Sequence, residues 1–128
     1  MKKLHVLIVD DSSVMRKIVE RSLRQAGLEL EEVKEASNGA EALTEVQKEN
    51  FDLILSDINM PAMDGLEFLR SLASIPNAKS VPVVMITTEG SEARVVEALS
   101  VGARGYIRKP FTAEQVKERV TPLLGDPQ

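Results

Sequence analysis

The chain has 128 residues, of which 43% are hydrophobic and 28% are charged, a balance typical of one globular domain. It contains no cysteine, which excludes disulfides and thiolate metal sites and fits a reducing compartment. The net charge of −4 argues against nucleic acid as a direct partner, because duplex binding requires a basic surface. No apolar run is long enough to span a membrane, and no cleavage site follows the first apolar stretch, so we expect a cytoplasmic protein.

The first half of the chain predicts three strands and two helices. Leu4–Val9 is apolar on both faces, as in a central parallel strand. A helix should follow, capped by Ser12 or Ser13 and stopped by Gly27. Its apolar residues recur at helical spacing: Val14, Met15, Ile18, Val19, Leu23 and Ala26. The remaining elements are a strand at Val33–Ala36, a helix marked by Ala40, Leu43 and Val46, and a strand at Phe51–Ser56.

The second half predicts two strands and three helices. Leu66, Leu69 and Leu72 mark the third helix, which Pro76-Asn77 should end. The fourth strand is expected at Val81–Ile86, and Ser91 should cap a fourth helix that Gly102 stops. Gly105–Arg108 is the fifth strand, and Thr112 with Gln115 forms a capping box for the last helix. Pro122 removes a backbone donor, so that helix should end or bend within a turn of it.

The strict alternation of strands and helices predicts one α/β domain, residues 1–128, with a parallel sheet and helices on both faces. Alternation alone does not fix the strand order. In a doubly wound sheet of order 2-1-3-4-5, the first and third strands would be neighbours at the switch point, where such sheets bind ligands.

Three carboxylates follow these two strands. Asp10 and Asp11 come after the first strand, and Asp57 ends the third. Three like charges at one edge require a proton or a cation, and hard oxygen ligands suit Mg²⁺, with Mn²⁺ as an alternative. An Asp-Asp pair alone would more simply be an acidic turn that caps a helix.

Other strand ends carry groups suited to an anion. Thr87 and Thr88 follow the fourth strand, and Lys109 with Pro110 follows the fifth. Carboxylates, a hydroxyl and an ammonium together indicate that the chain handles a phosphoryl group.

Four motifs give the chain a family resemblance that runs from Leu4 to about Leu124. They are Val9-Asp10-Asp11-Ser12, Ser56-Asp57-Ile58-Asn59-Met60-Pro61 continued by Met63-Asp64-Gly65, Ile86-Thr87-Thr88, and Tyr106-Ile107-Arg108-Lys109-Pro110-Phe111. The sequence resembles response-regulator receiver domains, and within them the stand-alone chemotaxis receivers of the CheY type. The resemblance implies the (βα)5 flavodoxin-like fold, with a five-stranded parallel sheet of order 2-1-3-4-5.

The resemblance also implies a role for each residue of the cluster. Asp57 would be the phosphoryl acceptor, Asp11 a direct Mg²⁺ ligand, and Asp10 a ligand that acts through water. The backbone carbonyl of Asn59 would complete the metal site beside Asp57, and Lys109 would pair with a phosphoryl oxygen. Members of the family have a cis bond at the position of Lys109-Pro110.

Thr87 and Tyr106 would be the switch pair. The hydroxyl of Thr87 would move to the new phosphoryl oxygens, and Tyr106 would then turn inward. Asn59 and Glu89 would flank the phosphoryl group and set its lifetime. The simpler alternatives are an ordinary strand residue for Thr87, a core aromatic for Tyr106, and solvated loop residues for Asn59 and Glu89.

The expected partners are a histidine kinase or histidine phosphotransfer domain, a phosphatase, and an output protein such as the flagellar motor switch. The output face would lie on the fourth helix, fifth strand and fifth helix, where Arg94, Arg104, Arg108 and Lys117 fall, although these residues also fit a plain charged surface. We expect a monomer, or a weak dimer when phosphorylated. His5, the only histidine, lies far from the carboxylates and is expected to be structural or solvated.

Other functions remain open at this point. The chain could be a receiver taken from a longer, for example DNA-binding, regulator, or a phosphorelay intermediate. A Mg²⁺-dependent phosphohydrolase of the haloacid-dehalogenase type would need an acid two residues after the nucleophile, where this chain has Asn59. A nucleotide-binding domain would need a glycine-rich loop after the first strand, which is absent from the sequence. We therefore expect a signalling switch that catalyses only its own phosphorylation and dephosphorylation.

Overall fold

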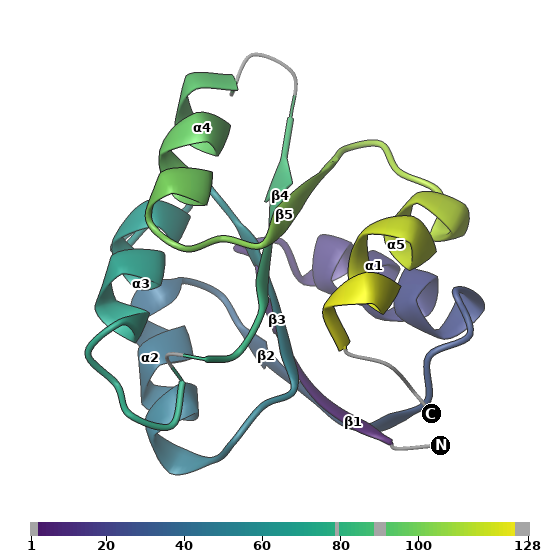
Figure 1. Cartoon of the computed structure of the whole chain (residues 1–128), viewed down its shortest axis with the longest axis horizontal. Coiled ribbons are helices and arrows are strands. Elements are labelled where there is room, and N and C mark those ends of the chain that lie inside the picture. The colour runs from purple at the N-terminus through teal and green to yellow at the C-terminus, as the bar shows by residue number, and fades with distance from the viewer. Residues whose placement is uncertain (1–2, 79, 89–91, 125–128) are drawn as a thin grey trace.

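The computed structural model of the chain describes residues 3–78, 80–88 and 92–124 (Figure 1). These residues form five strands and five α-helices in the expected alternation. The strands are β1 (Leu4–Val9), β2 (Leu30–Ala36), β3 (Leu53–Asp57), β4 (Val83–Thr87) and β5 (Gly105–Arg108). The helices are α1 (Ser13–Gln25), α2 (Gly39–Lys48), α3 (Gly65–Leu72), α4 (Glu92–Ser100) and α5 (Ala113–Val120), followed by the 3-10 helix η1 (Thr121–Leu124).

All five strands pair in parallel, in the order β2-β1-β3-β4-β5. This confirms the doubly wound fold that the resemblance implied. From β1 the chain moves outward to β2 and then crosses back to β3, on the other side of β1. Strands β1 and β3 pair in parallel from Val6 with Leu53 to Val9 with Ser56. The carboxyl ends of these two central strands therefore lie side by side, where open α/β sheets bind their ligands.

Helices cover both faces of the sheet (Figure 1). Helices α1 and α5 pack on one face, over a core that includes Val6, Ile8 and Leu55. Helices α2, α3 and α4 cover the other face, over a core that includes Leu7 and Ile54. Because successive strand residues point to opposite faces, the apolar run of β1 supplies both cores.

Short polar residues begin the helices, as the sequence predicted. The side chain of Ser12, not Ser13, caps α1 by accepting a hydrogen bond from the Met15 N–H. Thr112 and Gln115 form the expected capping box at the start of α5. The predicted cap at Ser91 lies outside the described residues.

The predicted starts of three strands were wrong by two or three residues. Strand β2 begins at Leu30 rather than Val33, because Leu30 and Glu32 pair with the start of β1. Strand β3 runs to Asp57, which pairs with Ile86 of β4, and it begins at Leu53 rather than Phe51. Strand β4 begins only after Pro82, which has no N–H to donate to the sheet.

Two further expectations concern the first and last helices. Not all of the regularly spaced apolar residues of α1 face the core. Val14 and Ile18 are exposed, whereas Val19 and Leu23 are buried. Helix α5 ends at Val120, and the chain continues as the 3-10 turn that contains Pro122. The helix therefore ends within a turn of Pro122, as expected.

Among the described helices, none combines the length and apolarity needed to cross a membrane.

Candidate functional site

Three carboxylates meet at the carboxyl edge of the sheet. Asp10 and Asp11 directly follow β1, and Asp57 is the last residue of β3. Because β1 and β3 are neighbours, one ligand oxygen from each of the three residues lies within 4.8 Å of the others. The structure thus brings together the carboxylates that the sequence placed on separate strand ends.

Asp10 is almost fully buried and is held by several contacts. Its carboxylate accepts a hydrogen bond of 2.9 Å from the Ser12 N–H and lies 3.4 Å from the Lys109 ammonium. The guanidinium of Arg16 donates to the backbone carbonyl of Asp10 at 2.6 Å and to the Glu35 carboxylate at 2.7 Å. The loop between β1 and α1 is therefore tied to α1 and β2, while Asp11 is left exposed.

Asp57 is also buried, and its carboxylate accepts a 2.8 Å hydrogen bond from the Ile58 N–H. Burial raises the pKa of Asp57 above its ordinary value, the Lys109 ammonium opposes this rise, and the Asp10 carboxylate adds to it. The Asp57 carboxylate is therefore less stable as an anion than a solvated aspartate.

Lys109 extends from the end of β5 into the carboxylate cluster. Its Nζ atom lies 3.4 Å from Asp10 Oδ2 and 3.6 Å from Asp57 Oδ2. The peptide bond between Lys109 and Pro110 is cis, as the resemblance implied. The cluster holds three carboxylates and one ammonium, so it keeps a negative charge that a divalent cation would neutralise. The residues present therefore fit a hard metal ion such as Mg²⁺.

Thr87, at the end of β4, is buried at the same edge. Its hydroxyl donates to the carbonyl of Thr88 at 3.2 Å, and its own carbonyl accepts from the Lys109 N–H at 2.7 Å. Tyr106 lies in β5, is partly buried against the α2–α4 side of the core, and has the Arg119 guanidinium 5.4 Å from its ring centre. The hydroxyl of Thr87 is therefore held only by one long hydrogen bond, and the side chain of Tyr106 is not fully buried.

The loop after β3 contains the other expected residues. Asn59 is exposed, and Met60 and Met63 pack against the core on the α2–α4 side. Glu89 lies outside the described residues. Ser56 is fully buried and donates to the Asp57 carbonyl, which agrees with a structural role.

The structure adds contacts around the site that the sequence alone did not show. A Cβ atom on Gly65 would lie 2.2 Å from the Asp57 carbonyl oxygen, so only glycine lets α3 begin this close to β3. Asp64 and Glu67 form a capping box at the start of α3, and Asp64 also binds Arg94 of α4 at 2.9 Å. The Asp-Gly pair was a detectable sign of a turn, but no local pattern predicted the contacts of Arg16 and Arg94.

A buried carboxylate beside an ammonium, in a cluster suited to a divalent cation, is equipped to accept an anionic electrophile. The fold and this arrangement define a doubly wound α/β protein with an acidic site at its switch point. The family model of the response regulator receiver domain matches residues 6–121, and the chain belongs to this family.

Curated relatives include CheY-type chemotaxis proteins. The chain is 41% identical over 123 residues to chemotaxis protein CheY-3 of Vibrio cholerae, covering 96% of this chain and 93% of that protein. It is also 41% identical over 124 residues to chemotaxis protein CheY1 of Helicobacter pylori, covering 95% and 98% of the two chains. The solved structure of the chemotaxis response regulator CheY4 of Vibrio cholerae matches with a TM-score of 0.82 and 39% identity, covering 95% and 99% of the chains.

Proposed function

We propose that this chain is a phosphorylation-activated response regulator of two-component signalling, with Asp57 as the phosphoryl acceptor. The observation that carries the proposal is the convergence of Asp10, Asp11 and Asp57 with Lys109 at one sheet edge. Because the curated relatives named above are chemotaxis proteins, control of chemotaxis or motility is the proposed pathway. The protein would act in the cytoplasm.

In this account a carboxylate oxygen of Asp57 attacks the phosphorus atom of a phosphohistidine on a kinase or phosphotransfer domain. An O–P bond forms while the N–P bond breaks, and the electron pair of the broken bond stays on the imidazole nitrogen. Acetyl phosphate would serve as a small donor in the same way, with acetate as the leaving group. Lys109 then holds an oxygen of the transferred group as a point charge.

Asp10, Asp11 and Asp57, with the backbone carbonyl of Asn59, would hold Mg²⁺, and Mn²⁺ would suit the same ligands. When bound, the ion supplies positive charge that offsets the repulsion between the Asp57 carboxylate and the incoming phosphoryl group. Arg16 supports this site, because it fixes the backbone at Asp10 and leaves the Asp11 side chain facing solvent.

The product of the reaction is a changed surface. Thr87 would redirect its hydroxyl from the Thr88 carbonyl to the phosphoryl group, and Tyr106 would move inward in response. The affected face consists of α4, β5 and α5. It carries exposed apolar side chains at Val96 and Leu99, which an output protein such as the flagellar motor switch could cover.

The basic residues of this face do not all remain available. Arg94 is already paired with Asp64, whereas Arg104, Arg108 and Lys117 are exposed. We infer that the last three residues contribute charge to the output interface. Asn59 and Glu89 would set the lifetime of the acyl phosphate by controlling access of water or of a phosphatase.

The phosphodonor would approach from the other side of the site. Val14 and Ile18 form an exposed apolar pair one helical turn apart at the start of α1, close in sequence to Asp11. A histidine-bearing helix of the kinase could cover them while its phosphohistidine reaches Asp57. In this account the protein is a monomer, or a weak dimer when phosphorylated.

The experiment that tests the proposal is intact-mass analysis after incubation with Mg²⁺ and acetyl phosphate. The wild-type chain should gain one phosphoryl group that hydroxylamine removes, and Asp57→Asn should gain none. Asp52→Asn is the matched control and should still be modified. It makes the same chemical change one residue before the start of β3, at the opposite end of the strand from Asp57. Phosphorylation of Asp57→Asn, or rapid turnover of many phosphomonoesters without an adduct, would contradict the switch and favour a phosphohydrolase.

A further inference from the structure

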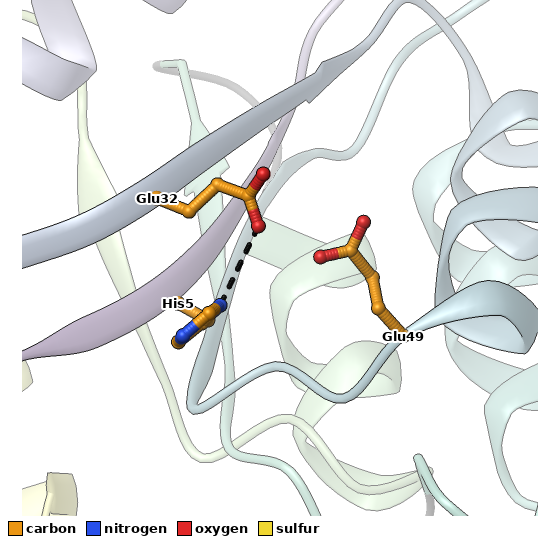
Figure 2. Close-up of side chains that lie close together, drawn as sticks. All are labelled: His5, Glu32 and Glu49. Atoms are coloured by element: carbon orange, nitrogen blue, oxygen red, sulfur yellow. Dashed lines mark ion pairs between the residues drawn. The ribbon is translucent and has the colours of Figure 1, made fainter.

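A second group of ligating side chains lies toward the amino edge of the sheet, away from the phosphoryl site. It consists of His5 near the start of β1, Glu32 of β2, and Glu49 at the C-terminal end of α2 (Figure 2). The proposed phosphotransfer uses none of these residues. We call the group the His5 cluster.

The sheet itself sets the positions of two members. His5 and Glu32 are directly paired residues of the parallel strands β1 and β2, so their side chains stand beside each other on one face. The Nδ1 atom of His5 lies 3.5 Å from Glu32 Oε1, and the carboxylate of Glu49 points toward this pair from the end of α2 (Figure 2). One ligand atom from each of the three residues lies within 4.8 Å of the others.

The charges within the cluster are only partly balanced. Lys34 Nζ lies 3.6 Å from Glu32 Oε2 and 3.8 Å from Glu49 Oε2, too far for strong hydrogen bonds. Lys34 approaches one carboxylate oxygen of each glutamate, while His5 approaches the other oxygen of Glu32, so the ammonium is a weakly held competitor for the two carboxylates.

We propose that His5, Glu32 and Glu49 form a binding site for a divalent transition-metal ion of the zinc type. An imidazole nitrogen with two carboxylate oxygens suits Zn²⁺, whereas Mg²⁺ and Ca²⁺ prefer oxygen ligands alone. Three protein ligands with water in a fourth position is a common zinc arrangement. The site is therefore chemically distinct from the all-carboxylate cluster around Asp57.

The ligand atoms must move closer to bind such an ion. Metal–ligand bonds of about 2.1 Å in a tetrahedral site place ligand atoms about 3.4 Å apart, so a pair at the 4.8 Å limit would have to close by about 1.4 Å. The side chains of His5, Glu32 and Glu49 are 41%, 42% and 29% exposed, which leaves them free to change rotamer. An ion bound here would link β1, β2 and the end of α2, and it would stabilise the folded state by mass action.

Calorimetric titration of the full chain with Zn²⁺, in excess Mg²⁺, tests the site. One ion should bind, and His5→Gln and Glu32→Gln should each weaken binding more than about tenfold, because even changing a partner of a ligand costs 10- to 100-fold in affinity. Glu31→Gln removes the same charge from the neighbouring, exposed residue of β2 and should leave the affinity unchanged. Asp11→Asn should also leave it unchanged, which separates this site from the carboxylate cluster at Asp57.

Two further measurements make the test independent of folding defects. His5 is the only histidine, so its imidazole NMR signals should shift on addition of Zn²⁺ in the wild-type chain. Lys34→Gln removes the competing ammonium and should tighten binding. The proposal is overturned if Zn²⁺ does not bind in excess Mg²⁺, if His5→Gln binds as tightly as the wild type, or if only Asp11→Asn loses the ion. If Zn²⁺ does not bind, His5 and Glu32 are neighbouring side chains without a metal-binding role.

Discussion

The ammonium group of Lys109 lies 3.6 Å from a carboxylate oxygen of Asp57, at the end of a strand two positions away in the sheet. Lys109 opposes the rise that burial causes in the pKa of Asp57. Lys109→Gln should therefore raise that pKa further and slow phosphorylation by acetyl phosphate roughly tenfold or more, since the positive charge that stabilises negative charge beside Asp57 is lost.

Carbon-13 NMR titration of the Asp57 carboxyl group measures the first effect, and the rate of mass gain measures the second. Lys17→Gln is the matched control, because Lys17 is an exposed lysine of α1 that pairs with Glu35. An unchanged pKa and rate in Lys109→Gln would show that the ammonium does not act on Asp57.

The raised pKa of Asp57 also predicts how stability changes with pH. The folded state binds this proton more readily than the unfolded state, so stability falls as the pH rises from below the unfolded pKa through the folded one. Asp57→Asn removes the buried charge and should raise the free energy of unfolding at pH 7 by on the order of 1 kcal/mol. Urea unfolding at pH 7 and at about pH 3, below the ordinary aspartate pKa, measures the difference. It should vanish at the lower pH, and a less stable Asp57→Asn at pH 7 would contradict the account.

The close contact between Gly65 and β3 predicts a large effect of a single methyl group. A Cβ atom at Gly65 would clash with the backbone of Asp57 and Ile58, so Gly65→Ala should cost about 1–3 kcal/mol of stability and weaken Mg²⁺ binding. Gly105→Ala is the control, because a Cβ atom there meets nothing within 4 Å and should change stability by less than about 0.5 kcal/mol. Urea unfolding measures both variants, and equal effects would show that Gly65 is not a close-packing requirement.

Thr87 is expected to couple the site to the output face rather than to perform the transfer. Thr87→Ala should still be phosphorylated, but beryllofluoride, a stable mimic of the phosphoryl group, should no longer shift the amide NMR signals of α4 and β5. Thr88→Ala removes the exposed neighbouring hydroxyl and should respond as the wild type does. A full response of α4 and β5 in Thr87→Ala would exclude the switch role.

Much of the fold could be predicted because local and global signals agree along this chain. The apolar run of β1 and the caps at Ser12 and Thr112 each have a physical reason that acts within a few residues. The start of β2 could not be predicted in the same way. Leu30 and Glu32 are in the strand because β1 lies beside them, and pairing across the sheet is not visible in a local pattern.

The features of the site also divide into those that a local pattern predicts and those that depend on the folded chain. The convergence of Asp10, Asp57 and Lys109 could be predicted because each ends or follows a recognisable strand, and parallel strands end at a common edge. The exposure of Val14 and the pairing of Arg94 with Asp64 could not, because they depend on which side of a helix faces the sheet and on contacts between distant helices. The environment of His5 is of this second kind, since Glu32 and Glu49 reach it only in the folded chain.

The most direct measurement of the central claim locates the phosphoryl group within the chain. After reaction with acetyl phosphate and Mg²⁺, borohydride reduces an acyl-phosphorylated aspartate to homoserine, and peptide mass mapping identifies the position. The account predicts homoserine at position 57 and at no other aspartate. Homoserine at position 10 or 11, or a stable phosphoryl group on a serine, a threonine or His5, would contradict it.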